Sequence, residues 1–380
     1  MAEDGRRSRR RFLAATVGVG ATALAGCSMV PGFGNDSSVS IPSLSEFRGS
    51  GALVEGRPAP GGTSIEDLPN LNGTLVLYLG GGEGGIYEQF IDELEKIYPN
   101  FNVESTRESS SNLANTIIEE GKQSPADLFW SIDAGSLAAV ANAGAYTSLP
   151  DNAVAEVPDS FVGDDNAWVG VAGRARSIPY NTNQLSEDDI PNKIADFTEA
   201  PALSPTGWAP TYGAFKSFVT AMRVLSGDDD TREWLESMQA QGVERYPNEQ
   251  VASSSVADGA VPAAFANHYY SMRVKNSRPD APLDLAFTEG DAGALVNVAG
   301  ALAIQGTNKD TLISRFVRHL LSAEAQEFFA TTSYSYPMIP GVEPVGELPT
   351  VDELSPPEMD LAELSDIEPT LDLMRDAGVL

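Results

Sequence analysis

The chain has 380 residues, of which 54 are Asp or Glu, 24 are Lys or Arg, two are His and one is Cys. The net charge of -30 excludes a nucleic-acid binder that relies on clustered positive charge. A single cysteine excludes a disulfide framework and a Cys-rich metal site. The apolar content of 42% is typical of a globular chain. Because acidic residues are spread along the whole chain, as in proteins that stay soluble in concentrated salt, we expect a halophilic protein.

The first 26 residues have the pattern of an export signal. Five arginines within positions 6–11 precede a short apolar stretch, which is typical of a signal peptide and too short for a membrane span. Residues 8–13 resemble the twin-arginine (Tat) motif, and residues 24–27 resemble a lipobox. We therefore expect a Tat-type lipoprotein signal over 1–26 and an extracytoplasmic protein anchored to the outer face of the cell membrane by a lipid on Cys27.

Residues 27–72 are rich in Gly, Pro and Ser and contain few periodic apolar positions. This composition predicts a flexible linker that holds the folded part away from the membrane.

After the linker, strand and helix patterns alternate along the chain. An apolar run that ends in glycines predicts a buried strand at 74–79, and apolar residues at helical spacing follow it. In chain order, the patterns predict helix 86–97, strand 102–103, helix 113–118, strand 127–130, helices 137–142, 215–225, 231–241 and one around 251, strands 284–287 and 294–298, and helices 311–321 and 371–374. Such alternation predicts an α/β fold with a mainly parallel sheet.

Residues 80–85 satisfy the G-x-G-x-x-G pattern between a strand and a helix, and Glu104 follows about 20 residues later. The pattern allows a Rossmann-type dinucleotide site, and we keep an exported oxidoreductase as an alternative function. A glycine loop that brings backbone N–H groups at a helix start close to a ligand explains the same residues. No catalytic constellation is recognised, so no catalytic residue is predicted and an enzyme is not expected.

Nine segments carry recognisable motifs: 120–129, 133–135, 173–176, 180–182, 208–211, 218–223, 267–270, 293–297 and 322–326. Together, over about 270 residues, they resemble the ferric-ion-binding proteins of ABC importers. The most specific parts are Asn-His-Tyr-Tyr at 267–270 and Gly-Arg-Ala-Arg at 173–176. The resemblance implies a two-lobed periplasmic-binding-protein fold of type II, similar to a transferrin lobe, whose lobes are joined by hinge strands and close over a ligand.

The resemblance also implies how the chain is divided between the lobes. Lobe 1 is expected over 73–175, lobe 2 over 176–293, and a return to lobe 1 over 294–342. A C-terminal segment over 343–380 is expected to pack back towards lobe 2.

Tyrosines are the metal ligands that the resemblance implies. Fe(III) prefers anionic oxygen ligands such as phenolate, and the family pattern places Tyr269 and Tyr270 on the ion. Neighbouring residues of a strand point to opposite sides, so two adjacent ligands require an irregular or helix-starting backbone. Tyr212 is implied as a further ligand of the metal or of its anion, and an aromatic residue at the rim of the site is the other interpretation.

In this family a small anion, carbonate or phosphate, completes the charge of the ferric ion. A guanidinium group and backbone N–H groups at helix starts are suited to hold it. The matching residues are Arg174, Gly213, Ala214, Asn248 and Asn267. For Arg176, a structural salt bridge is the alternative to a contact with the anion.

The first-lobe ligands of the family are missing here. Glu83 and Asp133 are candidate substitutes, with a solvated loop acid and a helix N-cap as their respective alternatives. A ferric chelate, an oxyanion or another small solute is the alternative ligand. For His268 we expect exposure on a helix face, with metal ligation as the alternative, and we expect His319 to be a surface or packing residue.

The predicted function is capture of Fe(III), closure of the lobes and delivery to a membrane permease. The expected partners are an ABC permease and its ATPase subunit, together with the membrane through the lipid anchor. Nucleic acid is not an expected partner, and a monomer is expected.

Overall fold

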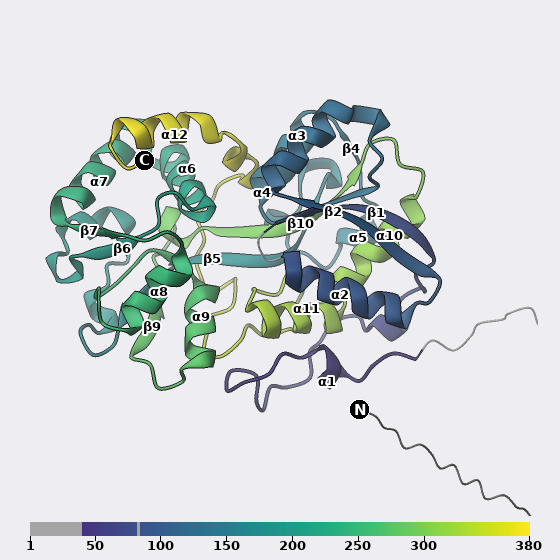
Figure 1. Cartoon of the computed structure of the whole chain (residues 1–380), viewed down its shortest axis with the longest axis horizontal. Coiled ribbons are helices and arrows are strands. Elements are labelled where there is room, and N and C mark those ends of the chain that lie inside the picture. The colour runs from purple at the N-terminus through teal and green to yellow at the C-terminus, as the bar shows by residue number, and fades with distance from the viewer. Residues whose placement is uncertain (1–39, 82–83) are drawn as a thin grey trace, which may run out of the picture. The chain divides into compact units, whose positions relative to one another are not determined.

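The computed structural model describes residues 40–81 and 84–380 (Figure 1). The predicted export signal, Cys27 and Glu83 lie outside the described residues. None of the helices in the described part combines the length and the apolar character that a membrane span needs.

The largest sheet in the described residues has eight strands. Its order is β2-β1-β3-β10-β5-β8, with β4 paired to β10 and β9 paired to β5, and a second sheet contains β6 and β7. The strands are β1 (Gly73–Gly80), β2 (Phe101–Glu108), β3 (Leu128–Ser131), β4 (Tyr146–Thr147), β5 (Val169–Asn181), β6 (Thr206–Trp208), β7 (Val243–Arg245), β8 (Ala266–Asn267), β9 (Leu283–Ala286) and β10 (Val296–Ile304).

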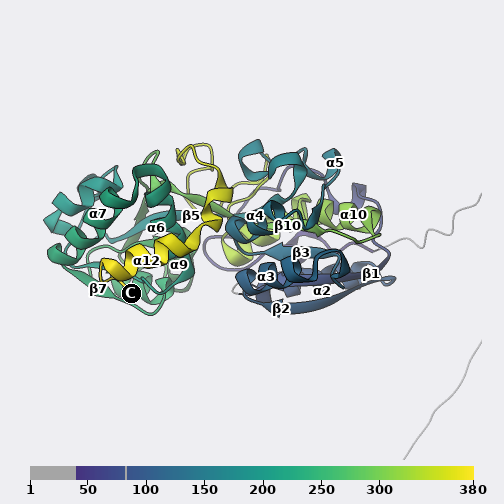
Figure 2. The ribbon, with the colours of Figure 1, turned by 90° about the horizontal axis from the view of Figure 1, so that it is seen from above.

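The helices surround these strands (Figures 1 and 2). They are α1 (Leu44–Phe47), α2 (Gly84–Ile97), α3 (Ser110–Glu120), α4 (Ala134–Asn142), α5 (Asp151–Val154), α6 (Gly213–Ser226), α7 (Asp228–Gln241), α8 (Glu249–Ala257), α9 (His268–Ser277), α10 (Asp310–Leu320), α11 (Ala323–Phe328) and α12 (Ile367–Asp376). We use lobe 1 for β1 to α5 with β10, α10 and α11, and lobe 2 for β6 to β9 with α6 to α9.

Two long strands connect the lobes. The first half of β5 pairs with β10, and its second half pairs with β8 and β9 of lobe 2. The end of β10 then pairs with β3 and β4 of lobe 1. These two strands are the predicted hinge strands, and Figure 1 shows them running side by side between the lobes.

The prediction of a mainly parallel sheet is only partly correct. β1 pairs in parallel with β2 and β3, as the alternating pattern predicts. β10 is antiparallel to β3 and β5, because the chain leaves lobe 1 along β5 and returns along β10. The sheet is therefore mixed.

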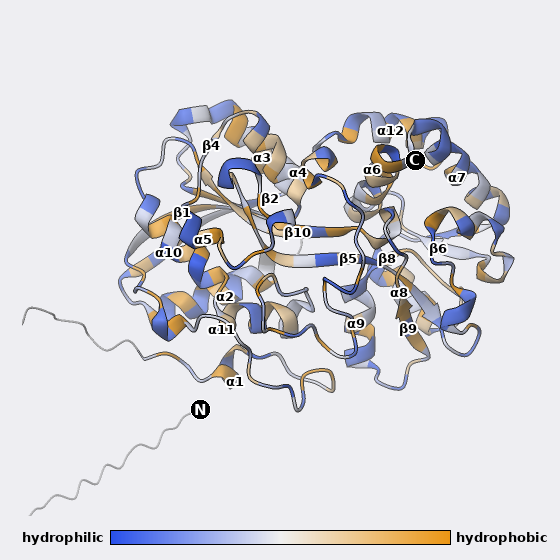
Figure 3. Ribbon diagram, turned by 180° about the vertical axis from the view of Figure 1, so that it is seen from behind, coloured by the Kyte–Doolittle hydropathy of each residue, from blue (hydrophilic) through white to orange (hydrophobic). Residues whose placement is uncertain are grey.

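Each lobe has its own aromatic core. In lobe 1 the ring of Tyr87 stacks on Trp130 with centroids 4.4 Å apart, and Phe329 meets both rings edge-on. In lobe 2 Phe218 and Trp234 pack against Phe265. The hydropathy colouring in Figure 3 shows apolar stretches on the strands and mixed polar and apolar positions on the outer helices. This amphipathic pattern is what helices need to cover a sheet.

Residues 40–72 differ from the predicted flexible linker, because they pack against lobe 1 and, through Ser50 and Leu53, against α9 of lobe 2. The Phe47 ring is 1% exposed and lies 6.3 Å from the Phe90 ring. Arg48 and Arg57 both donate to the buried carboxylate of Glu327, at 2.7 and 3.1 Å. The composition is loop-like, but a few apolar residues and two arginines fix this stretch on the folded domain.

The C-terminal segment contacts elements of both lobes. The short helix η10 (Leu361–Ser365) packs against α4, and α12 packs against α6 and α7. Thr370 on α12 shares a 2.9 Å hydrogen bond with Thr220 on α6. In Figure 1 the yellow α12 lies beside α6 and α7.

Candidate functional site

Tyr269 and Tyr270 are the second and third residues of α9. Their ring centroids lie 4.3 Å apart with an interplanar angle of 46°. On a strand, adjacent side chains would point to opposite faces, whereas the first turn of a helix lets both rings lie together. The helix-starting backbone expected for two adjacent ligands is therefore present.

Tyr212 reaches the same place from another helix. It is the N-cap residue of α6, and its hydroxyl is in hydrogen-bonding contact with the hydroxyl of Tyr270. The two rings are 6.0 Å apart in an edge-to-face arrangement. Three phenol groups from two helices thus meet in one cluster.

The rings of this cluster are buried. Tyr269 is 1% exposed and Tyr270 is 6% exposed, whereas Tyr212 is partly buried. They pack with a group of mostly apolar residues: Met272, Tyr334, Val345, Leu53, Leu285 and Leu348. A ligand that reaches these hydroxyls has to displace or move part of this cover.

Arg273 supplies a positive charge to the cluster. Its guanidinium carbon lies 5.1 Å from the centroid of the Tyr269 ring and 5.4 Å from that of Tyr270. A cation over an aromatic face is attracted by the ring quadrupole. Arg273 lies about one helical turn after the two tyrosines, and its guanidinium stabilises the position of both rings.

His268 is buried, so the expected helix-face exposure is wrong. Its Nε2 lies 2.7 Å from the carbonyl oxygen of Tyr334, and its Nδ1 lies 3.2 Å from backbone atoms of Ala175 on β5. Burial lowers the pKa of His268 to about 4, with smaller contributions from the charges of Arg174 and Arg273. The first residue of α9 is inward-facing because the helix starts against the hinge strand.

Arg174 and Arg176 lie two residues apart on β5, beside the start of α9. Arg174 is 8% exposed and lies opposite Asn297 of β10. Arg176 lies opposite Asn267 of β8 and forms an ion pair of 2.5 Å with Glu249. The salt-bridge interpretation of Arg176 is therefore correct.

The other predicted anion-binding residues lie at three helix starts. Gly213 and Ala214 begin α6, and open space lies next to the Gly213 α-carbon. Asn248 caps α8, with its Oδ1 accepting from the Val251 N–H at 3.0 Å. Asn267 precedes α9, but its Oδ1 accepts from Arg176 and does not cap the helix. The contact between Tyr212 and Tyr270 joins the start of α6 to the start of α9. The hydrogen bond from the Asn267 N–H to Glu249 joins the starts of α8 and α9.

Of the two candidate acids of the first lobe, only Asp133 lies within the described residues. Asp133 is the N-cap of α4, where its carboxylate accepts from the Ser136 N–H at 2.7 Å, so the N-cap interpretation is correct. Among the described residues, no group of three or more His, Cys, Asp or Glu side chains is placed to hold a metal ion. His319 is a packing residue in lobe 1, where Nε2 lies 2.9 Å from the Tyr98 hydroxyl.

Three residues in or beside the tyrosine cluster are not among those predicted from the sequence. Arg273 follows Tyr269 and Tyr270 by four and three residues, a spacing that places side chains on one helix face, so the sequence contains a signal for it. Glu249 and Tyr334 come from distant segments, and no local pattern marks their contacts with this region.

Comparison with known proteins gives consistent matches. The model of the bacterial extracellular solute-binding protein family matches residues 123–358. The major ferric iron-binding protein of Neisseria meningitidis serogroup B is 30% identical over 272 residues, which cover 70% of this chain and 82% of that protein. Iron uptake protein A2 of Synechocystis is 30% identical over 254 residues, covering 62% and 71%.

Solved structures show the same fold. Iron-bound HitA from Pseudomonas aeruginosa has a TM-score of 0.70 and 31% identity, covering 80% of this chain and 99% of that one. The Trichodesmium protein IdiA (FutA), solved with iron and citrate ligands, has a TM-score of 0.67 at 21% identity, covering 81% and 100%. These likenesses confirm the two-lobed type II periplasmic-binding-protein fold. Together with the family model, which matches more than half of the chain, they show that the chain belongs to the bacterial extracellular solute-binding protein family.

Proposed function

We propose that this protein binds Fe(III) through the phenolate oxygens of Tyr269, Tyr270 and Tyr212. The observation that carries the proposal is the meeting of three phenol groups at the starts of α6 and α9. Fe(III) is a hard cation that favours anionic oxygen, and its charge drives the loss of the phenol protons on binding. The relatives named as ferric iron-binding proteins support this ligand over a dinucleotide.

The anion is proposed to lie beside the tyrosines, at the starts of the lobe 2 helices. Gly213 and Ala214 offer backbone N–H groups at the start of α6, and Asn248 and Asn267 lie at the starts of α8 and α9. Arg174 contributes a guanidinium from the hinge strand. Helix N-termini and a guanidinium together favour a small oxyanion such as carbonate or phosphate.

Loading and release require a movement, because the rings of Tyr269 and Tyr270 are nearly fully buried. β5 and β10 join the lobes, and a change of their backbone angles would separate lobe 1 from lobe 2. We propose that the open form takes up iron, that closure holds it, and that an ABC permease with its ATPase subunit receives it. The protein would act as a monomer tethered to the outer face of the membrane by a lipid on Cys27, without catalysing a reaction.

The test is spectroscopic. Purified protein without its first 26 residues is titrated with ferric citrate, and the visible absorption of a phenolate-to-Fe(III) charge-transfer transition is recorded. The band should appear with a one-to-one endpoint, weaken when both Tyr269 and Tyr270 are replaced by Phe, and be lost when Tyr212 is replaced as well. A spectrum without this band, or a band that survives the triple replacement, contradicts the proposal. Binding of intact ferric citrate differs from binding of the bare ion, because labelled citrate then remains with the protein after gel filtration.

A further inference from the structure

A buried ion pair joins the hinge strand to the helices that carry the candidate ligands. The Nη1 of Arg176 on β5 lies 2.5 Å from Oε1 of Glu249, the first residue of α8. The two side chains are 4% and 0% exposed. Burial of both charges makes this contact short and strongly directional.

The same two side chains fix the residue that precedes α9. The second carboxylate oxygen of Glu249 accepts from the Asn267 N–H at 2.8 Å. The Asn267 Oδ1 accepts from Arg176 Nη1 at 3.1 Å. Arg176, Glu249 and Asn267 therefore form a closed ring of contacts, and Tyr269 and Tyr270 follow Asn267 within three residues.

Arg176 also contacts the helix that Tyr212 begins. Its guanidinium carbon lies 5.3 Å from the centroid of the Phe218 ring on α6. One guanidinium group thus touches α6 and, through Glu249 and Asn267, the starts of α8 and α9. These contacts reach every element that supplies a candidate phenol ligand.

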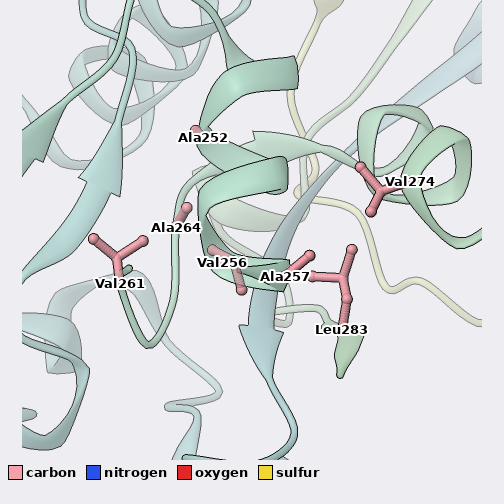
Figure 4. Packing of buried hydrophobic residues seen from close by; sticks show 7 residues of the cluster. All are labelled: Ala252, Val256, Ala257, Val261, Ala264, Val274 and Leu283. Carbon is pink, nitrogen blue, oxygen red and sulfur yellow. The ribbon is translucent and has the colours of Figure 1, made fainter. Parts of the chain in front are cut away.

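Along their length α8 and α9 pack through apolar side chains, and at their C-terminal ends Arg278 and Asp258 form an exposed ion pair of 2.6 Å. Val256 and Ala257 of α8 pack with Val274 of α9 and Leu283 of β9, as Figure 4 shows. Such packing fixes the distance between the helices but has little directional preference. The buried directional contacts are made at the helix starts, where the ion pair of Arg176 and Glu249 lies, whereas the exposed pair at the other ends contributes little.

A contribution to folding stability does not by itself explain why a buried ion pair occupies this position. Apolar residues of similar volume are often as good or better in such a position, because both charges lose their hydration. In addition, Arg176 Nη2 is buried and makes no hydrogen bond within the part of the chain that the structure describes. Such a donor lowers the stability gained from the pair. Directional control is what the pair provides beyond packing.

We infer that Arg176 and Glu249 are positioning residues that set the orientation of the tyrosine ligands at the start of α9. This inference rests on the proposed function. Neither side chain is assigned a bond to the metal: both act through Asn267 and Phe218.

The experiment replaces the pair with neutral residues of similar size, in the double variant Arg176→Met with Glu249→Gln. Ferric affinity is measured by competition with citrate, the charge-transfer band is recorded, and thermal unfolding is followed by circular dichroism. We expect a folded protein whose ferric affinity falls at least tenfold and whose band shifts in wavelength or loses intensity. The single variant Arg176→Lys, which keeps the charge but not the planar guanidinium, should lie between the double variant and the wild type.

A matched control is the pair Arg57 and Glu327, which joins residues 40–72 to α11 with side chains 9% and 1% exposed. The double variant Arg57→Met with Glu327→Gln should lose thermal stability but keep the wild-type affinity and band. If the Arg176 and Glu249 variants keep both the affinity and the band, the inference is wrong. If the wild type shows no band, the proposed function fails and this inference fails with it. If the double variant does not fold, the Arg176→Lys variant provides the test. A lower ferric affinity and an altered band then support the inference, and wild-type values contradict it.

Discussion

The hydroxyl groups of Tyr212 and Tyr270 are in hydrogen-bonding contact, although the two residues are 58 positions apart in the chain. Each lies at the beginning of a different helix, α6 or α9. Two hydroxyls in hydrogen-bonding contact are close enough for their oxygens to bind one cation after deprotonation. The contact therefore identifies Tyr212 as a partner of the tyrosine pair, beyond its position at a helix start.

Replacement of Tyr212 by Phe is expected to weaken ferric binding and shift the charge-transfer band. Because loss of a group one shell removed from a metal already costs about 10- to 100-fold in affinity, loss of a direct ligand should cost about 100-fold or more. Titration with ferric citrate measures both quantities. Tyr246→Phe is the control, since Tyr246 lies in lobe 2 beside the apolar cluster of α8 and α9. A Tyr212→Phe protein with an unchanged band but an altered response to carbonate would assign this residue to the anion.

The local parts of the fold were predictable from the sequence. Strand β1 and helices α2, α6 and α10 follow from apolar residues at regular spacing. Strand β5 was not predicted, because all of its residues are buried and Arg174, Arg176 and Pro179 interrupt any apolar alternation. The antiparallel pairing of β5 with β10 depends on the return of the chain more than a hundred residues later, which no local pattern contains.

A substitution at Phe47 can distinguish between residues 40–72 packed on lobe 1 and residues 40–72 as a flexible linker. Phe47→Ala should lower the free energy of unfolding by about 3 kcal/mol, because the removed ring is buried against Phe90 and a cavity remains. Ser45→Ala, at an exposed position of the same helix, should change it by less than about 0.5 kcal/mol. Urea unfolding of the two variants and the wild type provides the comparison. Equal stability of all three proteins would mean that residues 40–72 are not held on lobe 1 in solution.

For the candidate site, the resemblance gave the residues and chemistry gave the backbone requirement. Adjacent tyrosines on one ion need a helix start, and α9 begins one residue before Tyr269. The contacts around this pair could not be predicted from local sequence patterns. Glu249 and Arg176 are 73 positions apart in the chain, and Tyr334, whose carbonyl contacts His268, is 66 positions from it. His268 was placed on the wrong side of its helix for the same reason.

The contact between α4 and the C-terminal segment should be sensitive to one added methyl group. A β-carbon on Gly135 would lie 2.8 Å from the Leu364 carbonyl oxygen, and this backbone atom is not free to rotate away. Gly135→Ala should therefore destabilise the protein by about 1–3 kcal/mol, despite the better helix propensity of Ala. It should also expose the chain near η10 to limited proteolysis.

Gly85→Ala on α2 is the matched control, since its β-carbon would find only the end of the Arg107 side chain, at 3.9 Å. This variant should be neutral or up to about 1 kcal/mol more stable. Urea unfolding and timed proteolysis of both variants measure the difference. A Gly135→Ala protein that behaves like Gly85→Ala would show that η10 does not press on α4.

His319 on α10 makes stability depend on pH. Its pKa is lowered to about 4, mainly by burial, with smaller effects of Arg318 and Arg315. Its Nε2 lies 2.9 Å from the hydroxyl of Tyr98, whose pKa is raised to about 12 by burial and by Glu324, so this partner stays neutral across the acid range. In the folded state, the side chain of His319 is therefore the neutral imidazole.

Acidification should destabilise the protein through this histidine. As the pH falls below about 6.5, the unfolded chain takes up a proton at His319 while the folded chain does not. The stability contributed by the neutral imidazole is full above this pH and is lost progressively towards pH 4, for a total of roughly 3 kcal/mol at most. His319→Gln removes the titrating group, so the stability of this variant should fall less steeply than that of the wild type between pH 6.5 and 4.5. Urea unfolding at several pH values measures both slopes. If the slopes are equal, His319 has the same pKa in the folded and unfolded chains, and its burial next to Tyr98 does not hold in solution.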